Sequence, residues 1–312
     1  MNVRRCALLA VIACSPLWAT GAPAENTARS TGSDVRDFSL PSLYHVGFWV
    51  RDIAKARVFY HDFLGFDEPY ELRRANGDLQ MVVMKVNERQ VIYLFPDATK
   101  ILPSGDNLDH LGLETDNIEA ARKRLLAHGI KVGAVNRGRI GDLLLGVNDP
   151  DGHRYELTQF APEGQLLKNQ GKAFAPGRVS SHLRSATLSS ADLAASLRFY
   201  LDALAMKHVA GADHADAVRV QVPDGTDFLE LVPYRREAGA EPARAVPEFC
   251  LEVADAAKTA ELLSERAKAL GLARPAPVST GLDGLRRTSV IDPDGTIVVL
   301  KETAAVGTGR AK

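Results

Sequence analysis

The sequence predicts an α+β protein built from four βαβββ modules that form two tandem domains. The first observation is an internal repeat: Asp-Ile-Ala-Lys-Ala-Arg-Val-Phe-Tyr at 52–60 matches Asp-Leu-Ala-Ala-Ser-Leu-Arg-Phe-Tyr at 192–200, an offset of 140 residues. The second is that Asp149-Pro-Asp-Gly recurs at Asp292, an offset of 143 residues. The third is that each half alternates helical 3.6-residue periodicity with the short alternating apolar runs that are typical of strands.

Each half divides again into two modules. His45 and His110 stand in similar contexts 65 residues apart, so each is expected in the first strand of a module. Apolar spacing predicts the helices of the first half at about 52–64 and 117–128. Alternation predicts further strands near 79–86, 90–95, 142–148 and 153–159. We therefore expect one domain at 43–160 and a second at 182–303, joined by a linker at 161–181 that contains Pro-Gly turn signals.

The N-terminus is typical of a secretory signal. Arg4 and Arg5 precede a short apolar stretch, and Ala22-Pro-Ala24 provides a cleavage site, which predicts a signal peptide at 1–24 and an exported, periplasmic or secreted protein. A lipoprotein-like Val-Ile-Ala-Cys, which would anchor the chain through Cys14, is the less favoured alternative. The stretch is too short to favour a membrane span.

The remaining ends and the composition limit the class of protein. Residues 25–42 are expected to be a flexible lead-in and residues 304–312 a flexible tail. Cleavage would leave Cys250 as the sole cysteine, so no internal disulfide is expected. With 25% charged residues and a formal net charge of −1, the chain has no basic excess that would favour nucleic acid as a partner. A small molecule is the expected partner.

Three residues form a candidate metal site. His45 and His110 each lie in a short apolar run, and Glu156 follows the Asp-Pro-Asp-Gly turn in the last strand of the first half. Alternation places all three on the strand faces opposite the apolar ones, together with Trp49, whereas Tyr44 is expected on the apolar face with Val46. Two imidazoles and one carboxylate form a ligand set that leaves coordination positions open on a divalent metal.

These motifs resemble those of the vicinal oxygen chelate superfamily, which includes glyoxalases, extradiol dioxygenases and bleomycin or fosfomycin resistance proteins. The resemblance covers both halves and rests on His45-Val-Gly, Phe59-Tyr60, His110-Leu-Gly and Asp149-Pro-Asp-Gly with Glu156. It implies paired βαβββ modules whose sheets curve around a metal held by His45, His110 and Glu156. Fe(II) is the favoured metal because three protein ligands with open positions suit oxygen chemistry, and Mn(II), Zn(II) or Ni(II) are alternatives.

The second half provides an internal comparison. Alignment of Phe199 with Phe59 places Ser185 at the position of His45, Glu248 at that of His110 and Val299 at that of Glu156. Serine and valine cannot complete this ligand set, so the second half is expected to be a degenerate domain without metal. Both Asp-Pro-Asp-Gly turns occur with and without the ligands, which favours a structural role for them.

The resemblance leaves the reaction open. A glyoxalase-type isomerisation needs a carboxylate at the position of Tyr93, and tyrosine is a poor base near neutral pH, so a dioxygenase-like reaction on a small, oxygen-chelating substrate is favoured. The ring-cleaving relatives, however, have a tyrosine at the position of Gly146 and a histidine upstream of it, which this chain lacks. His153 is the candidate substitute for these proton-handling groups, and Tyr93 is a second catalytic candidate.

The face assignment suggests that Trp49 and Tyr93 border the metal cavity, where Trp49 would bind a flat or aromatic substrate. The alternatives are a glyoxalase-like lyase or isomerase, and a non-catalytic protein that binds a drug or antibiotic. The oligomeric state is expected to be a monomer or a homodimer. Five other histidines are interpreted as surface groups: His61, His128, His182, His208 and His214.

Overall fold

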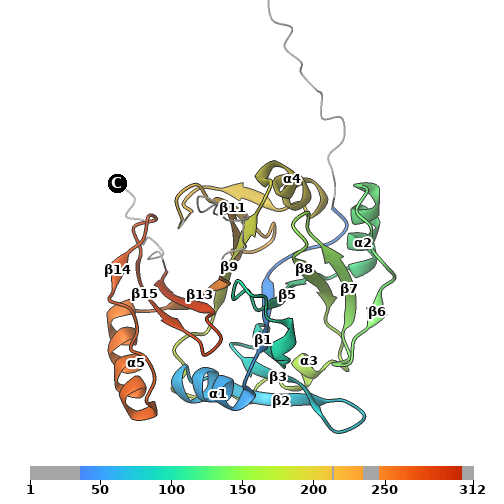
Figure 1. Ribbon diagram of the computed structural model, residues 1–312. Helices are drawn as coiled ribbons and strands as arrows, with labels where there is room; N and C mark the ends of the chain where they lie inside the picture. Colours follow the sequence, from blue (N-terminus) through green and yellow to red (C-terminus); the bar gives the residue numbers. More distant parts are fainter. Residues whose placement is uncertain (1–35, 213, 235–245, 304–312) are drawn as a thin grey trace, which may run out of the picture. The chain divides into compact units, whose positions relative to one another are not determined.

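The computed structural model describes residues 36–212, 214–234 and 246–303 (Figure 1). The predicted signal peptide, Cys14, residues 25–35 of the lead-in and the predicted tail lie outside the described residues. No helix among the residues described is long and apolar enough to cross a membrane.

Two sheets of eight strands form the framework, one from each half of the chain. The first sheet has the order β2-β3-β4-β1-β5-β8-β7-β6, with strands β1 (Leu43–Val50), β2 (Asp67–Arg73), β3 (Leu79–Lys85), β4 (Val91–Pro96), β5 (Leu108–Glu114), β6 (Asn136–Arg137), β7 (Leu143–Asn148) and β8 (Arg154–Gln159). The second repeats that order as β10-β11-β12-β9-β13-β16-β15-β14, with strands β9 (Leu183–Ser190), β10 (Lys207–Val209), β11 (Val218–Gln221), β12 (Phe228–Pro233), β13 (Glu248–Val253), β14 (Ser279–Thr280), β15 (Arg286–Ile291) and β16 (Ile297–Glu302). The predicted fold class is therefore confirmed.

The helices cover the apolar faces of these sheets. They are α1 (Ile53–Arg57), which continues as a π-helix (Val58–Phe63), α2 (Ile118–Ala127), α3 (Gln165–Lys168), α4 (Leu193–Leu197), which continues as a π-helix (Arg198–Ala203), and α5 (Ala256–Leu270), with a 3-10 turn at Ala98–Lys100. In Figure 1, α2 lies beside β7 and α5 beside β15. Asp52 begins α1 by accepting from the backbone N–H groups of Ala54 and Lys55, which satisfies donors that the first turn leaves unpaired.

In each module of the first half, the apolar pattern did not locate one strand, and the second half has its counterparts. These are β2, β6, β10 and β14, and they form the two edges of each sheet. In β2 the sequence Asp-Glu-Pro-Tyr-Glu-Leu-Arg does not alternate, and Pro69 removes one ladder donor, which an edge strand tolerates. β6 and β14 have only two residues each. Edge strands bury little, so their sequences carry a weak signal.

Two β-bulges change which side chains lie above the first sheet. In the ladder between β1 and β5 the register shifts once at Tyr44 and once at Asp109, leaving each as an extra residue. The bulge turns Tyr44 away from the apolar core: its hydroxyl lies 2.9 Å from Thr158 Oγ1, and its ring packs against His45. The prediction that Tyr44 shares a face with Val46 was therefore wrong, because strict alternation fails at a bulge.

The first sheet curls until its two edge hairpins meet. The Arg139 guanidinium, in the turn between β6 and β7, donates to the backbone carbonyl of Arg73 at the end of β2. β2 and β6 are the two opposite edge strands of the first sheet. Because the edges are joined, the face opposite the helices is concave and can enclose a cavity.

The two halves are joined by a reciprocal pair of tyrosine–aspartate hydrogen bonds. Tyr60, in the π-helix of the first half, donates to Asp292 at 2.9 Å, and Tyr200 in the second half donates to Asp149 at 2.6 Å. The third residue of each Asp-Pro-Asp-Gly turn also contacts the other half. Asp294 accepts a hydrogen bond from the N–H of Arg51, and Asp151 accepts one from the N–H of Ala191. The Phe-Tyr and Asp-Pro-Asp-Gly repeats thus hold the halves together, which agrees with the structural role expected for the turns.

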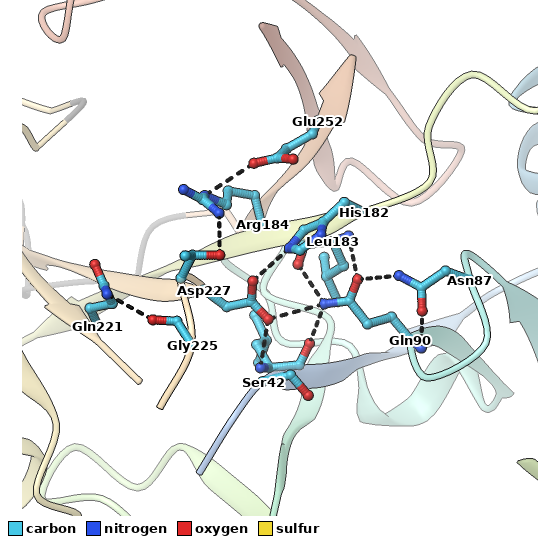
Figure 2. A network of polar contacts seen from close by, with 12 residues as sticks. Ser42, Asn87, Gln90, His182, Leu183, Arg184, Gln221, Gly225, Asp227 and Glu252 are labelled. Carbon is cyan, nitrogen blue, oxygen red and sulfur yellow. Dashed lines mark hydrogen bonds and ion pairs between the residues drawn. The ribbon is translucent and has the colours of Figure 1, made fainter. Parts of the chain in front are cut away.

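A second polar junction lies where β1 and β9 begin (Figure 2). The buried Gln90 amide donates to the carbonyls of Leu43 and Leu183 and accepts from the N–H of Leu183. Asp227 accepts from the N–H of Leu43 and pairs with His182 at 2.6 Å. Burial raises the pKa of Asp227, although the neighbouring His182 opposes this effect. The network satisfies polar groups that the contact between the halves would otherwise bury unpaired.

Part of the predicted lead-in belongs to the core. Phe38 and Leu40 are buried, and Asp224 accepts from both the Arg36 side chain and the N–H of Leu40. The expectation of a flexible segment at 36–42 differs from the structure, because Phe38 and Leu40 are buried in the core and Ser39 donates its N–H to Asp116 of the first half. The expected linker at 161–181 contains α3, whose Leu166 is buried.

Candidate metal centre

His45, His110 and Glu156 converge above the first sheet. One ligand atom from each lies within 4.8 Å of those of the other two, and the rings of the two histidines are 4.6 Å apart. The three residues come from β1, β5 and β8, which are consecutive neighbours in the sheet. Among the described residues this is the one group of His, Cys, Asp and Glu side chains with the spacing of a metal site.

The register of β1 and β5 explains the His-x-Gly motifs. His45 is paired with Gly112, and Gly47 with His110, so each histidine lies across from the glycine of the other motif. A Cβ atom on Gly112 would lie 2.2 Å from His45 Nδ1, and one on Gly47 would lie 3.2 Å from the His110 ring. The glycines are therefore required because the two imidazoles fill the space above them.

The buried nitrogen atoms of this group indicate a bound cation. His45 is fully buried, yet neither of its ring nitrogens has a hydrogen-bond partner among the described residues; His110 Nε2 has no hydrogen bond there either and faces Glu156 Oε2 at 3.4 Å. A buried polar atom without a partner is costly, and imidazole nitrogens are common ligands of divalent metals. The donor set therefore fits a divalent metal.

Asp109 and Arg154 orient two of the three ligands. His110 Nδ1 lies 2.6 Å from Asp109 Oδ2, so that a proton on Nδ1 leaves Nε2 directed at Glu156, 3.4 Å away. Arg154 donates to Glu156 Oε1 at 2.8 Å and lies 3.5 Å from Asp109. The sequence interpretation missed Asp109, because only the bulge places it on the same face as His110.

The pKa shifts follow from these contacts. Burial lowers the pKa of His45, and the neighbouring His110 and Arg154 lower it further, which favours the neutral, ligand-competent imidazole. Burial also acts to lower the pKa of His110, but the Asp109 and Glu156 carboxylates outweigh it and raise the value. For Glu156, burial is outweighed by His110 and Arg154, so its pKa is lowered and the carboxylate is ionised.

A cavity of about 410 Å³ opens beside this group. Its wall includes His110, Glu156, Trp49 and Tyr93, so both aromatic residues predicted to border the site do so. The Tyr93 ring lies 4.4 Å from that of His45. Burial and the nearby Tyr44 and Tyr70 raise the Tyr93 pKa well above its ordinary value, so its hydroxyl is protonated at neutral pH. The remaining lining residues are Leu72, Arg74, Gln80, Met81, Phe95, Asp109, Arg137, Gly138, Arg139, Ile140, Leu144 and Arg154.

The structure does not bring His153 to this cavity. His153 is 5% exposed and directs Nδ1 at Asp149 Oδ2, 2.8 Å away. It precedes Arg154 in the chain, so alternation turns it to the face opposite Glu156, and it lines a small pocket with Thr187 of the second half. The hypothesis that it replaces a proton-handling group is therefore withdrawn. Gly146, paired with Glu156, has open space where a side chain would project.

The second half has the predicted residues at the equivalent positions. Cys250 is paired with Ser185 and Val299, just as Gly112 is paired with His45 and Glu156 in the first half. Glu248 lies two residues before Cys250, as His110 lies two residues before Gly112. Cys250 itself is buried, as expected. The glycine positions are filled by Cys250 and Thr187, which is possible because the opposing histidines are absent from this pair of strands.

Basic side chains contact the carboxylates of this second sheet. Glu230, at the position of Tyr93, contacts His214 Nδ1 at 2.9 Å and pairs with Arg219, and His214 Nε2 lies 3.4 Å from Glu248. His214 and His182 are therefore partly buried ion-pair members, and their interpretation as surface groups was wrong. Their partners are distant in sequence, which concealed the contacts.

Comparison with known proteins agrees with this architecture. Residues 42–157 match the model of the Glyoxalase/Bleomycin resistance protein/Dioxygenase superfamily. The uncharacterised protein YaeR of Escherichia coli strain K12 is 30% identical over 125 residues, which are 38% of this chain and 97% of YaeR.

Solved structures share the fold over both halves. The Mn(II)-bound glyoxalase of Novosphingobium aromaticivorans is 16% identical, with a TM-score of 0.63 over 85% of this chain and 83% of its own. The 2,3-dioxygenase LapB of Pseudomonas sp. KL28 is 14% identical, with a TM-score of 0.64 over 88% of this chain and 96% of its own. The chain belongs to the Glyoxalase/Bleomycin resistance protein/Dioxygenase superfamily, which confirms the family resemblance seen in the sequence.

Proposed function

We propose that this protein is a metal-dependent enzyme in which His45, His110 and Glu156 hold a divalent ion. The observation that carries the proposal is the convergence of three ligand atoms within 4.8 Å, with both nitrogens of a fully buried histidine unpartnered in the described part of the chain. Fe(II) is the proposed metal, with Mn(II), Zn(II) or Ni(II) as alternatives.

The proposed reaction is dioxygenase-like chemistry on a small substrate that offers vicinal oxygen atoms. A redox-active metal at this site would polarise those oxygens and exchange electrons with molecular oxygen. Glyoxalase-like isomerisation is less well supported: Tyr93 occupies the position of the expected carboxylate base, and its raised pKa keeps it protonated. Dioxygenases among the similar structures, including LapB, support the same choice at the level of the fold.

The side chains around the ligands suggest how the site would work. Asp109 fixes the ring of His110, and Arg154 holds Glu156, so two ligands are positioned before any substrate enters. The protonated Tyr93 hydroxyl, which interacts with those of Tyr44 and Tyr70, would donate a hydrogen bond to a substrate oxygen that replaces one of them. Trp49 and Phe95, whose rings lie 5.2 Å apart, provide an apolar wall for a flat substrate and exclude water from part of the cavity.

Metal analysis of the protein purified without chelators tests the proposal. We expect about one ion per chain, and His110→Ala should reduce the bound metal by about tenfold or more. Glu248→Ala is the matched control, because Glu248 occupies the equivalent position in the second half. Unchanged metal content in His110→Ala, or equal loss in both variants, would contradict the assignment of the ion to the first half.

If metal is present, oxygen consumption with a panel of catechols distinguishes the reactions. Uptake of oxygen together with ring-cleavage absorbance is the expected result. Metal binding without oxygen uptake by any catechol would favour a lyase, an isomerase or a non-catalytic binding protein. We also propose that the protein is exported, and N-terminal sequencing of the mature protein would locate cleavage after Ala24 or modification at Cys14.

A further inference from the structure

The cavity next to the candidate metal centre has an excess of positive charge. Four arginines line it, Arg74, Arg137, Arg139 and Arg154, against two carboxylates, Asp109 and Glu156. A divalent ion at the centre would add to the excess. A cavity with this charge balance favours an anionic molecule over a neutral one of the same shape.

Three of these arginines, Arg74, Arg137 and Arg139, come from the two edge hairpins of the sheet, and Arg154 comes from β8. Arg74 lies in the turn between β2 and β3, and Arg139 in the turn between β6 and β7. The hydrogen bond from Arg139 to the Arg73 carbonyl holds these two turns together. Arg74 and Arg139 are therefore placed side by side in the chain's tertiary structure, although 65 residues separate them in sequence.

The four guanidinium groups differ in how far the protein already neutralises them. Arg154 is paired with Glu156 and Asp109, and Arg137 with Glu163. In the ranges that the structure describes, Arg139 contacts a backbone carbonyl but no carboxylate within ion-pair distance. Arg74 makes no side-chain hydrogen bond or ion pair there. Both arginines are exposed and line the cavity, and the carboxylate of Asp97 interacts with Arg74 only through space.

Other residues of the cavity wall are aromatic or apolar. Trp49, Tyr93, Phe95 and Met81 line it, and a volume of about 410 Å³ suits one small molecule. A ligand in this cavity would therefore meet candidate metal ligands, flat apolar side chains and guanidinium groups within one small volume.

We propose that Arg74 and Arg139 recognise a carboxylate on a small aromatic substrate whose vicinal oxygens reach the metal centre. The proposal deepens the proposed function and rests on it for the orientation of the substrate, while the anion site itself requires no metal. Guanidinium groups suit a carboxylate because their donors match its two oxygens. The substrate class is thus an aromatic acid with adjacent hydroxyl groups.

Benzoate and benzamide test the anion site without metal chelation. Binding is measured by titration calorimetry and by quenching of tryptophan fluorescence, because Trp49 lines the cavity. We expect benzoate to bind about tenfold or more tightly than benzamide, and the preference to shrink as salt screens the exposed arginines. Equal binding of the two probes would overturn the proposal.

Arg74→Gln is the decisive variant, because Arg74 has no side-chain contact to lose in the described structure. It should reduce the preference for benzoate about tenfold and leave benzamide binding unchanged. Arg139→Gln should also reduce the preference for benzoate about tenfold. Because it removes the hydrogen bond to the Arg73 carbonyl as well, the unfolding midpoint of this variant is measured too. Arg198→Gln, an exposed arginine in the second half, is the control and should keep the preference. If both Arg74→Gln and Arg139→Gln keep the full preference for benzoate over benzamide, the assignment of the anion site to these arginines is refuted.

The same variants in Zn(II)-loaded protein separate this proposal from the metal proposal. With 3,4-dihydroxybenzoate and its amide as probes, His110→Ala should weaken both about equally, whereas Arg74→Gln should weaken only the acid. Loss of preference in Arg74→Gln without any effect of His110→Ala would leave the anion site intact and contradict the metal centre. The reverse result would retain the metal centre and remove the anion site.

Discussion

At the scale of single residues, the two halves treat the same positions in chemically different ways. In the first half, both ring nitrogens of His45 and the Nε2 atom of His110 lack a hydrogen bond within the described part of the chain, and they lie close to the Glu156 carboxylate. In the second half, Glu230 and Glu248 are contacted by His214, so a side-chain cation lies among the carboxylates. The positions are equivalent in the repeat, and the difference between the halves follows from a few side chains.

His214 gives the second half a pH dependence. Its hydrogen bond to Glu230 and that to Glu248 raise the pKa of His214 from 6.5 to about 10. Because the folded-state pKa lies above the unfolded one, the stabilisation is complete below about pH 6.5 and is lost as the pH rises toward about 10. Arg219 also contacts Glu230 and remains charged throughout this range.

The prediction is therefore a pH-dependent difference between wild type and His214→Gln. The free energy of unfolding should favour wild type most near about pH 6, and the difference should shrink steadily toward about pH 10. Urea unfolding at several pH values measures it. His208→Gln, which removes an exposed imidazole of β10, is the control. A difference that is constant with pH would show that His214 does not carry the expected charge.

At the scale of elements, the pairing of β1 with β5 builds the site. Its two bulges bring Tyr44 and Asp109 to the cavity face, and its register places each histidine across from a glycine. The bulge at Tyr44 has a counterpart at Arg184 in the second half, where the ladder between β9 and β13 also skips one residue. The bulge is thus a feature of the repeated fold, whereas its use beside a histidine pair belongs to the first half.

Gly112→Ala tests the importance of this close approach. The new Cβ would lie 2.2 Å from His45 Nδ1 and 2.5 Å from a Tyr44 ring carbon, so the His45 ring must move. We expect a loss of stability of about 1–3 kcal/mol from overpacking. Metal affinity should fall about tenfold or more, because the ligand is displaced.

Gly146→Ala provides the matched control on the neighbouring strand β7. A Cβ there has no atom of the described residues within 4 Å, so both the unfolding midpoint and the metal affinity should match wild type. Calorimetric metal titration and thermal unfolding check both variants. If Gly112→Ala binds metal as tightly as Gly146→Ala, the ring of His45 is not held as tightly as the structure indicates.

At the scale of the whole molecule, the repeat motifs join the halves. Tyr60 reaches Asp292 and Tyr200 reaches Asp149, so each half supplies the tyrosine for the turn of the other. Tyr155 of the first sheet extends this arrangement, with its hydroxyl 2.7 Å from that of Tyr200. The described residues from Arg36 onward accordingly belong to one compact unit.

Tyr60→Phe should lower the free energy of unfolding by about 1–3 kcal/mol, because the buried Asp292 carboxylate loses a donor. Tyr200→Phe should cost at least as much, since the Tyr155 hydroxyl also loses its partner. The double variant should show nearly the sum, because the two contacts share no residue. Urea unfolding followed by circular dichroism measures all three. Unchanged midpoints would mean that apolar contacts alone hold the halves together.

The sequence by itself determined the repeat, the α+β class, the superfamily and the three candidate ligands. These follow from periodicity and from short motifs, because the residues that form them are close together in the chain or recur at a fixed offset. Strand alternation also predicted the sheet face on which Glu156 lies. The fixed repeat offset predicted that Ser185, Glu248 and Val299 occupy the positions of the three ligands in the second half.

The tertiary structure alone decided which further side chains surround the ligands. Asp109 reaches the cavity, and Tyr44 packs against His45, through bulges, and alternation cannot predict a bulge. Arg74 and Arg139 meet because the sheet curls and joins its edges, while His153 is turned toward the second half. Contacts between distant segments depend on the closure of the sheet and the packing of the halves, and a local sequence pattern carries no information about either.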